Sequence, residues 1–450
     1  MSRRGCCRVL GSVLAVFFYA SIWIVFDRYH RGEHVEETLT VLGGETVRVG
    51  DLVKAARRAA SIAPDRTTEW ENAALLAART FGEGGRQQRR EGLQKKALLC
   101  ATFTNSSDAA SLQHVVSNME VMKGLCDWAV LFYDRDSSSS GIRRLEREAK
   151  ALGVSVVKSE FVESRDAVLE RHGVALSVTP STLEESLALR RSRPSSSSSS
   201  TGEEMKAFNS LVYPKSVQYM SLLDLLPQYE RAWLLDADIS LAGFQPDRFF
   251  QIVDCAFAAK PLVAQPLISE NTQSYKFLRS LQWREFQAKD RAEKKVILAT
   301  SSAFVEIQAP LVDAQFFEWF LRYFTAPLLR PSHILGADWG IDALFCKAAH
   351  AFAAASSGKT RLEKPGVSIG TDACMLVVAG SPLHHVDRRV LDGALGKAVK
   401  KRLNRALMRI VEATFPNFYK SGHDKDANML EFPKRFHFSR SFESKTCAVL

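Results

Sequence analysis

The chain has 450 residues, of which 46% are hydrophobic and 24% are charged. This composition is typical of a globular protein and is enough for one large domain with appendages. The formal net charge of +10 favours anionic partners such as lipid headgroups, nucleotides, phosphates or acidic glycans. Nucleic acid is not an expected partner, because the sequence shows no zinc-knuckle spacing, no RNA-recognition strand and no recognition-helix pattern.

The amino-terminal residues predict a membrane anchor. Arg3, Arg4 and Arg8 precede an uncharged, mostly apolar run over residues 9–26. A helix of this length reaches about 27 Å, which just spans a thin bilayer. The arginines favour a cytoplasmic tail over residues 1–8, so that the rest of the chain faces a lumen. A cleaved signal peptide is the alternative, although the run is long for one and lacks a convincing cleavage site.

These features predict a single-pass type II protein of the Golgi membrane, with the endoplasmic reticulum or secretion as alternatives. Asn105 begins an Asn-Ser-Ser glycosylation sequon, which is usable only in a lumen. Six of the eight cysteines would be lumenal, and they could form up to three disulfides or remain buried thiols. Residues 447–450 fit a prenylation box, which needs a cytosolic C-terminus and therefore conflicts with the predicted orientation.

The segment after the anchor divides into a stem and the start of a domain. Residues 27–93 are charged and rich in alanine and arginine, which predicts a stem with some helix. Apolar runs at 95–103, 128–133 and 154–158 are separated by polar helical stretches, a pattern that favours parallel strands with crossover helices. The serine-rich stretch at 192–204 predicts a disordered insertion.

Alternating elements continue after the insertion. A helix over 215–226 and a strand over 231–235 are expected first. The later expectations are strands at 262–268, 302–307, 367–369 and 375–378, helices at 313–324 and 340–349, and a basic helical segment at 388–411. The basic segment is interpreted as a solvated charged face or as a contact with anionic headgroups. We expect one α/β domain over 94–415 and a C-terminal extension over 416–450.

Two carboxylates, Asp236 and Asp238, follow an apolar strand directly. Ligand sites of α/β sheets lie at this edge, and neighbouring like charges call for a cation. Hard oxygen ligands favour Mg²⁺ or Mn²⁺, whose open positions suit a diphosphate. The alternatives are a solvated turn, or a phosphatase with Asp236 as the nucleophile, although such phosphatases carry the motif on the first strand of their domain.

Several other residues are candidates for the same site. Lys215 begins the helix before this strand and is a candidate for a phosphate contact or a plain surface lysine. Asp338 and Asp342 are four residues apart at a predicted helix start, where they either cap the helix or act on an acceptor hydroxyl. His384 and His385 follow the last strand and are candidate metal ligands, and a structural role is the alternative.

Arginine and tryptophan complete the candidate set. Arg388 or Arg389 can pair with a phosphate through two hydrogen bonds. Trp283, Trp319 and Trp339 are candidates for stacking on sugar rings, although core packing is the commoner role of such side chains.

Taken together, these segments resemble an uncharacterised domain family that is grouped with the GT-A glycosyltransferases. The resemblance covers residues from about 95 to 395. It rests on Lys215 with its helix and on residues 229–239, 304–310, 339–347 and 382–391.

The resemblance implies a Rossmann-like, GT-A-like α/β fold with a mixed, mainly parallel sheet flanked by helices. It implies that Asp236 and Asp238 bind the metal, with His385 as the third ligand in preference to His384. By the same analogy Asp342 lies near the acceptor. Ala237 departs from the family pattern, in which a third acidic residue is often found.

The function implied is that of a metal-dependent glycosyltransferase of the secretory pathway. It would transfer a sugar from a nucleotide-sugar donor to a glycan, protein or lipid acceptor, with Mn²⁺ or Mg²⁺ as cofactor. Within this hypothesis Lys215, Asp236, Trp339 and Arg389 bind the donor. A non-catalytic nucleotide-sugar- or glycan-binding protein on the same fold is the alternative, and a phosphatase is a third.

Overall fold

The computed structural model describes only part of the chain. The described residues are 38–40, 46–48, 74–81, 95–133, 140–162, 215–256, 260–269, 297–302, 304–329, 341–356, 373–378, 382–386 and 441–443. The predicted anchor at 9–26, the serine-rich stretch at 192–204, the strand at 367–369 and the basic segment at 388–411 lie outside them. Within the described part, no helix is long and apolar enough to cross a membrane.

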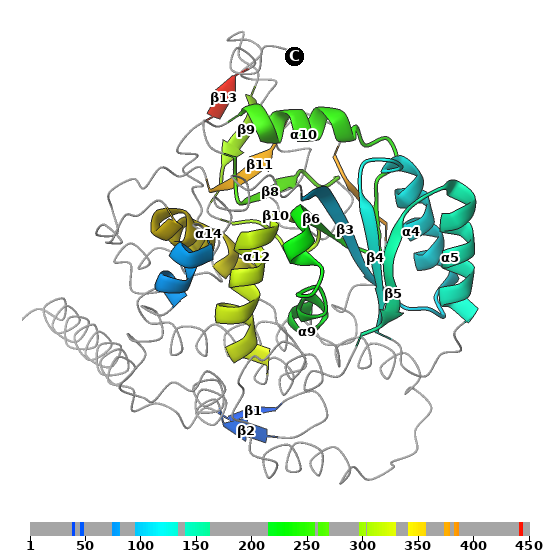
Figure 1. The fold of residues 1–450 in the computed structure, drawn as a ribbon, viewed down its shortest axis with the longest axis horizontal. Coiled ribbons are helices and arrows are strands. Elements are labelled where there is room, and N and C mark those ends of the chain that lie inside the picture. Colours follow the sequence, from blue (N-terminus) through cyan, green and yellow to red (C-terminus); the bar gives the residue numbers. More distant parts are fainter. Residues whose placement is uncertain are drawn as a thin grey trace, which may run out of the picture.

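A mixed sheet of nine strands forms the centre of the described structure, in the order β13-β9-β11-β8-β10-β6-β3-β4-β5 (Figure 1). Strands β3, β4, β5, β6, β8, β11 and β13 run in one direction, and β9 and β10 run in the other. This confirms the prediction of a mixed, mainly parallel sheet. The strands are β3 Lys96–Thr104, β4 Asp127–Phe132, β5 Val156–Phe161, β6 Tyr229–Asp236, β8 Val263–Pro266, β9 Ile297–Ser301, β10 Leu311–Asp313, β11 Cys374–Val377 and β13 Ser441–Glu443.

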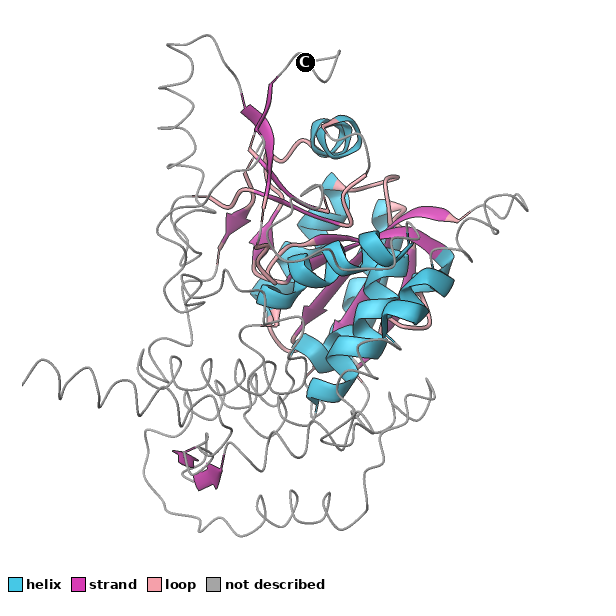
Figure 2. Ribbon diagram, turned by 90° about the vertical axis from the view of Figure 1, so that its left-hand side faces the viewer, coloured by secondary structure: helices cyan, strands magenta, loops and turns pink. Residues whose placement is uncertain are grey.

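Helices pack on both faces of the sheet, which gives three layers (Figure 2). Helices α4 (Ala109–Val121), α5 (Ser140–Leu152) and α10 (Pro246–Cys255) share one hydrophobic core with the first face. A helix at 74–81, α9 (Lys215–Met220), α12 (Ala314–Phe320) and α14 (Asp342–Ser356) share another core with the second face. Short helical turns follow α9 and α12 as η1 (Leu226–Gln228) and the π-helix η3 (Leu321–Thr325).

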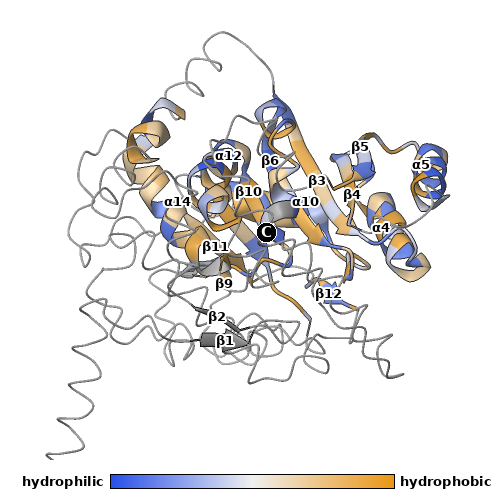
Figure 3. Ribbon diagram, turned by 90° about the horizontal axis from the view of Figure 1, so that it is seen from below, coloured by the Kyte–Doolittle hydropathy of each residue, from blue (hydrophilic) through white to orange (hydrophobic). Residues whose placement is uncertain are grey.

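The hydrophobic pattern explains why these segments form these layers. The central strand β3 is buried over most of its length, because its parallel neighbours β4 and β6 flank it and helices cover both faces. Helix α5 instead buries only a narrow side, with Leu145 and Ala149 in the core. Figure 3 shows this contrast, with β3 coloured mainly as hydrophobic and α5 mainly as hydrophilic.

Trp319 belongs to the core and not to a sugar-binding surface. Its side chain is fully buried in α12, and its indole Nε1 donates a hydrogen bond to the carbonyl of Ala74 at 2.7 Å. This contact ties the helix at 74–81, which lies in the segment predicted as a stem, to the domain core. At the other end of the chain, β13 pairs with β9, although its residues fall in the predicted C-terminal extension.

The strand expected at 302–307 is wrong. Residues 304–306 have no regular structure, and strands β9 and β10 lie before and after them. The hydroxyl of Ser302 hydrogen-bonds to the backbone of Phe304, and the amide of Glu306 donates to the Gln265 side chain at 2.8 Å. These bonds replace the strand ladder, because side-chain groups compete with neighbouring strands for the backbone.

Cysteine pairing, which the sequence left open, is settled for one pair. Cys346 of α14 and Cys374 of β11 form a disulfide whose Cα atoms are 5.5 Å apart. Cys255 is also disulfide-bonded, whereas Cys100 and Cys126 are free thiols. The helix that begins at Asp342 is therefore covalently attached to the sheet.

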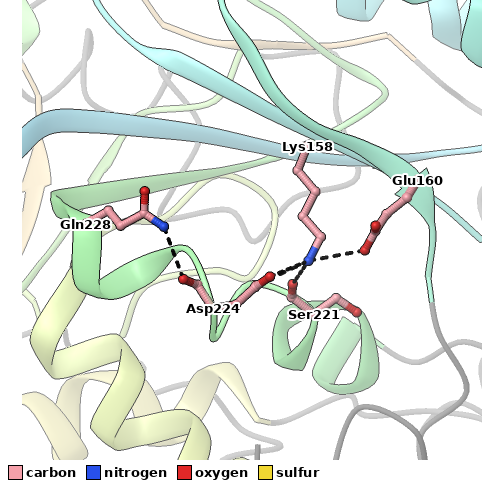
Figure 4. A network of polar contacts seen from close by, with 5 residues as sticks. All are labelled: Lys158, Glu160, Ser221, Asp224 and Gln228. Carbon is pink, nitrogen blue, oxygen red and sulfur yellow. Dashed lines mark hydrogen bonds and ion pairs between the residues drawn. The ribbon is translucent and has the colours of Figure 1, made fainter. Parts of the chain in front are cut away.

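Polar groups fix the edge of the sheet at β5 to the segment before β6 (Figure 4). The ammonium of Lys158 contacts the carboxylates of Glu160 at 3.1 Å and Asp224 at 3.0 Å, and it donates to the carbonyl of Ser221. Gln228 donates to the backbone carbonyl of Asp224. The side chain of Lys158 is largely buried between these partners, and none of the residues in the network belongs to the site described next.

Candidate functional site

The paired carboxylates lie at the carboxyl end of β6. Strand β6 runs parallel to β3, and Phe103 is the register partner of Asp236. Residues 232–235 are buried, whereas Asp236 and Asp238 are half-buried where the strand leaves the sheet. The predicted position of the two aspartates at the carboxyl edge of a parallel strand is therefore confirmed.

A small antiparallel pair of strands brings the late histidine to the motif. Strand β7 (Ile239–Ser240) follows Asp238 directly and pairs with β12 (His384–His385). The backbone amide of Val386 donates to the carbonyl of Asp238 at 2.8 Å. His385 Nε2 lies 3.2 Å from Asp238 Oδ2, whereas His384 is exposed.

A lysine from α9 holds the first aspartate. Lys215 Nζ lies 2.5 Å from Asp236 Oδ2, and Lys215 also reaches the carbonyl of Ile307 at 3.4 Å. The hydroxyl of Tyr219, one turn later in the same helix, donates to that carbonyl as well, at 3.0 Å. The structure thus brings together four of the predicted site residues: Lys215, Asp236, Asp238 and His385.

The charges of these side chains depend on one another. Burial raises the pKa of Asp236, and the charge of Asp238 raises it further, against the opposing effect of Lys215. Burial also acts to raise the pKa of Asp238, but the hydrogen bond and the charge of His385 outweigh it and lower that pKa. Burial acts to lower the pKa of His385, but Asp238, Asp236 and Glu306 together raise it.

One oxygen of this site has no protein partner. Asp238 Oδ1 is buried and accepts no hydrogen bond, although Oδ2 of the same carboxylate contacts His385. An unpaired carboxylate oxygen away from water is costly, and a cation removes that cost. Within the described part of the chain no three His, Cys, Asp or Glu side chains are grouped as a metal site. Two carboxylates with substrate phosphates are nevertheless a common donor set for Mg²⁺.

Three polar residues near the carboxyl ends of β6 and β8 were not predicted, namely Gln265, Glu306 and Gln308. Gln265 of β8 is fully buried, its Nε2 has no partner, and its Oε1 accepts the hydrogen bond from the Glu306 amide. Gln308 accepts a hydrogen bond from the Asp236 amide through its backbone carbonyl at 3.0 Å. A sequence signal exists, because Gln265 and Glu306 each interrupt an apolar run.

Asn118 of α4 is a further buried polar residue that the sequence analysis missed. Its Nδ2 donates to the carbonyl of Ile239 at 2.6 Å, and its Oδ1 accepts from the amide of Leu241 at 2.8 Å. Both partners lie in or directly after β7. The side chain therefore anchors the segment that follows Asp238 to the helix layer.

The remaining predicted residues are not brought to the site by described contacts. Asp338, Trp339 and Arg389 lie outside the described residues, and for Asp342 only the backbone is described, as the first residue of α14. Asn105 lies at the carboxyl end of β3, where its Oδ1 accepts hydrogen bonds from the amide and the hydroxyl of Ser107.

The fold and the site define a three-layer α/β protein with paired carboxylates at the carboxyl edge of its sheet. No family model and no curated protein matches the chain. Among solved structures, glucosyl-3-phosphoglycerate synthase from Mycobacterium tuberculosis, in complex with phosphoglyceric acid, is similar over 71% of this chain and 80% of its own, with 12% sequence identity and a TM-score of 0.32. Similarity at this level adds no argument about the function of the present chain.

Proposed function

We propose that the chain is a metal-dependent glycosyltransferase that uses a nucleotide-sugar donor and Mn²⁺ or Mg²⁺. The observation that carries this proposal is the unpaired, buried Asp238 Oδ1 beside Asp236 at the carboxyl edge of a mainly parallel sheet. In such sheets ligands bind outside the carboxyl ends of the strands. The acceptor is a glycan, a protein or a lipid.

Four described side chains would bind the metal and the diphosphate of the donor. Asp236 and Asp238 would hold the metal, and His385 keeps the second carboxylate in place or joins the donor set. Lys215 puts an ammonium within 2.5 Å of Asp236, where it is available to a phosphate oxygen. A bound divalent cation supplies positive charge that stabilises the nucleoside diphosphate as it leaves.

Residues outside these contacts enter the proposal through the sequence. Asp342, with Asp338 before it, is proposed to orient or deprotonate the acceptor hydroxyl. Trp339 and Arg389 are proposed to contact the donor. The disulfide at Cys346 supports a fixed position for α14, because it ties this helix to β11 one turn after Asp342.

We also propose that the domain is lumenal, anchored by residues 9–26 in the Golgi membrane. The Cys346–Cys374 disulfide supports an oxidising compartment, since such bonds persist in secretory compartments and are rare in the cytosol. The endoplasmic reticulum and secretion are the alternatives, and Asn105 would carry a glycan in any of them.

A thermal-shift screen tests the donor site. The full chain, purified in detergent, is heated with UDP, GDP, CMP and their sugars, with and without Mn²⁺. We expect a Mn²⁺-dependent rise in melting temperature with one nucleotide, because a ligand that binds only the folded state stabilises it. The Asp238→Asn variant should lose this rise. Asp247→Asn, an exposed carboxylate of α10, is the matched control and should keep it.

Other outcomes separate the alternative functions. Binding of a nucleotide-sugar without its turnover favours the non-catalytic binding protein. Hydrolysis of a generic phosphatase substrate that is lost in Asp236→Asn favours the phosphatase. No shift with any nucleotide in a folded protein would contradict the proposal.

A further inference from the structure

We propose that Gln265 and Gln308 form a subsite for a hydroxyl group of the donor sugar, next to Asp236. This inference rests on the proposed function, since it assigns part of the donor to residues outside the metal pair. It starts from one buried atom without a partner in each of two side-chain amides, Gln265 Nε2 and Gln308 Oε1. Gln265 lies in the carboxyl half of β8, and Gln308 pairs through its backbone with Asp236 at the carboxyl end of β6.

The sheet register puts Gln265 on the same face as Asp236. Strand β10 pairs with both β6 and β8, and Leu311 is the partner of Trp233 on one side and of Ala264 on the other. These three side chains share one hydrophobic core. Because side chains alternate along a strand, Asp236 and Gln265 point to the opposite face, which α9 covers.

The hydrogen bond that Gln265 makes identifies which atom of its side-chain amide has no partner. Its oxygen accepts the hydrogen bond from the amide of Glu306, so the group without a partner is the Nε2 donor. The side chain is fully buried. Buried donors of this kind are nearly always satisfied in folded proteins, which points to a partner that is bound from outside the chain.

Gln308 supplies the complementary acceptor. Its backbone carbonyl accepts the hydrogen bond from Asp236, so its side chain begins beside the metal pair, and its Oε1 is buried without a partner. A sugar hydroxyl is both a donor and an acceptor, and it can accept from Gln265 Nε2 while it donates to Gln308 Oε1. A phosphate oxygen cannot do this at neutral pH, because it only accepts. The pair therefore suits the sugar better than the diphosphate.

Substitutions that remove either the hydrogen-bond donor or the acceptor, one at a time, test the subsite. Gln265→Glu keeps an oxygen for the Glu306 amide and loses the Nε2 donor, whereas Gln308→Met loses the Oε1 acceptor at similar size. Gln228→Met is the matched control, since this exposed glutamine lies just before β6, at the other end of the strand from Asp236. The full chain is titrated with the nucleotide-sugar that stabilises it and with the corresponding free nucleoside diphosphate, both with Mn²⁺ and without acceptor.

We expect each site variant to bind the nucleotide-sugar about tenfold more weakly and the free nucleoside diphosphate as the parent does. The control should bind both ligands with the affinity of the parent.

Equal affinity of parent and site variants for the nucleotide-sugar overturns the subsite and leaves the proposed function standing. An ordered water would then satisfy the two amides. Equal loss of both ligands overturns it too, because the residues would then support the site as a whole. If the parent binds no nucleotide-sugar, the proposed function fails and the subsite fails with it.

Discussion

At the scale of single residues, the site is defined by the partner of each carboxylate. Asp236 has Lys215 as its partner, and Asp238 has His385, so each carboxylate is held by a nitrogen-bearing side chain from a different part of the chain. The sequence predicted these four residues because each stands at the end of an expected element, and the family resemblance selected His385 in preference to His384. It did not predict Gln265 or Glu306, since their role follows only from a hydrogen bond between two segments that are distant in sequence.

Two adjacent histidines allow a direct test of the metal shell. His385 contacts Asp238, and His384 is exposed. We expect His385→Ala to weaken Mn²⁺ binding by about 10- to 100-fold, as is usual when a ligand or the group that orients it is removed. Titration with Mn²⁺ followed by electron paramagnetic resonance measures this. His384→Ala should bind Mn²⁺ as the parent does, and equal effects of the two substitutions would refute the assignment of His385.

At the scale of elements, the sequence predicted long apolar strands better than short paired ones. Strands β3, β4 and β6 lie close to their expected positions. A central strand that is buried on both faces has a continuous apolar sequence, which is easy to recognise. The short strands β9 and β10 were missed, since their pairing depends on neighbours from elsewhere in the chain. The helix expected to reach residue 226 ends at Met220 as α9, and turns follow.

Substitution of Asn118 tests whether α4 stabilises the segment that follows Asp238. It links α4 to β7 through two hydrogen bonds. Asn118→Ala leaves the Ile239 carbonyl and the Leu241 amide without partners in a buried place, so we expect the free energy of unfolding to fall by about 2–4 kcal/mol. Urea denaturation measures the loss.

Metal affinity separates an anchoring role from a purely structural one. We expect Asn118→Ala also to weaken Mn²⁺ binding in the fraction that remains folded, because β7 follows Asp238 directly. Gln113→Ala, an exposed position on the same helix, should change neither quantity. Loss of stability with unchanged Mn²⁺ affinity would show that Asn118 supports the fold alone.

At the scale of the whole molecule, the candidate site and a cluster of stabilising polar contacts lie at opposite ends of the parallel strands. The candidate site occupies their carboxyl ends. At their amino ends Asp127 contacts Lys96 at 2.6 Å and accepts a hydrogen bond from the Tyr229 hydroxyl at 2.8 Å, which joins β4, β3 and β6. Burial acts to raise the pKa of Asp127, but the hydrogen bonds from Lys96, Ser155 and Tyr229 outweigh it and lower that pKa.

This cluster predicts a pH dependence of stability. A carboxyl group whose pKa is lowered on folding stabilises the folded state above its unfolded pKa of about 3.9, and the contribution is lost as the pH falls through the lowered value. At pH 7 we expect Asp127→Asn to be less stable than the parent by about 1–3 kcal/mol. The difference should shrink below about pH 4, as measured by urea denaturation across pH. A difference that stays constant with pH would contradict this.

The disulfide between Cys346 and Cys374 has a practical consequence for how this protein is produced. The bond attaches α14 to β11 a single turn after Asp342, the residue proposed to act on the acceptor. A bacterial host that makes the chain in its reducing cytoplasm would deliver it with this attachment open. Expression in an insect or mammalian secretory system, or export to a bacterial periplasm, preserves the start of α14 as the structure describes it. An assay that finds no transfer activity is therefore informative only for protein made in an oxidising host.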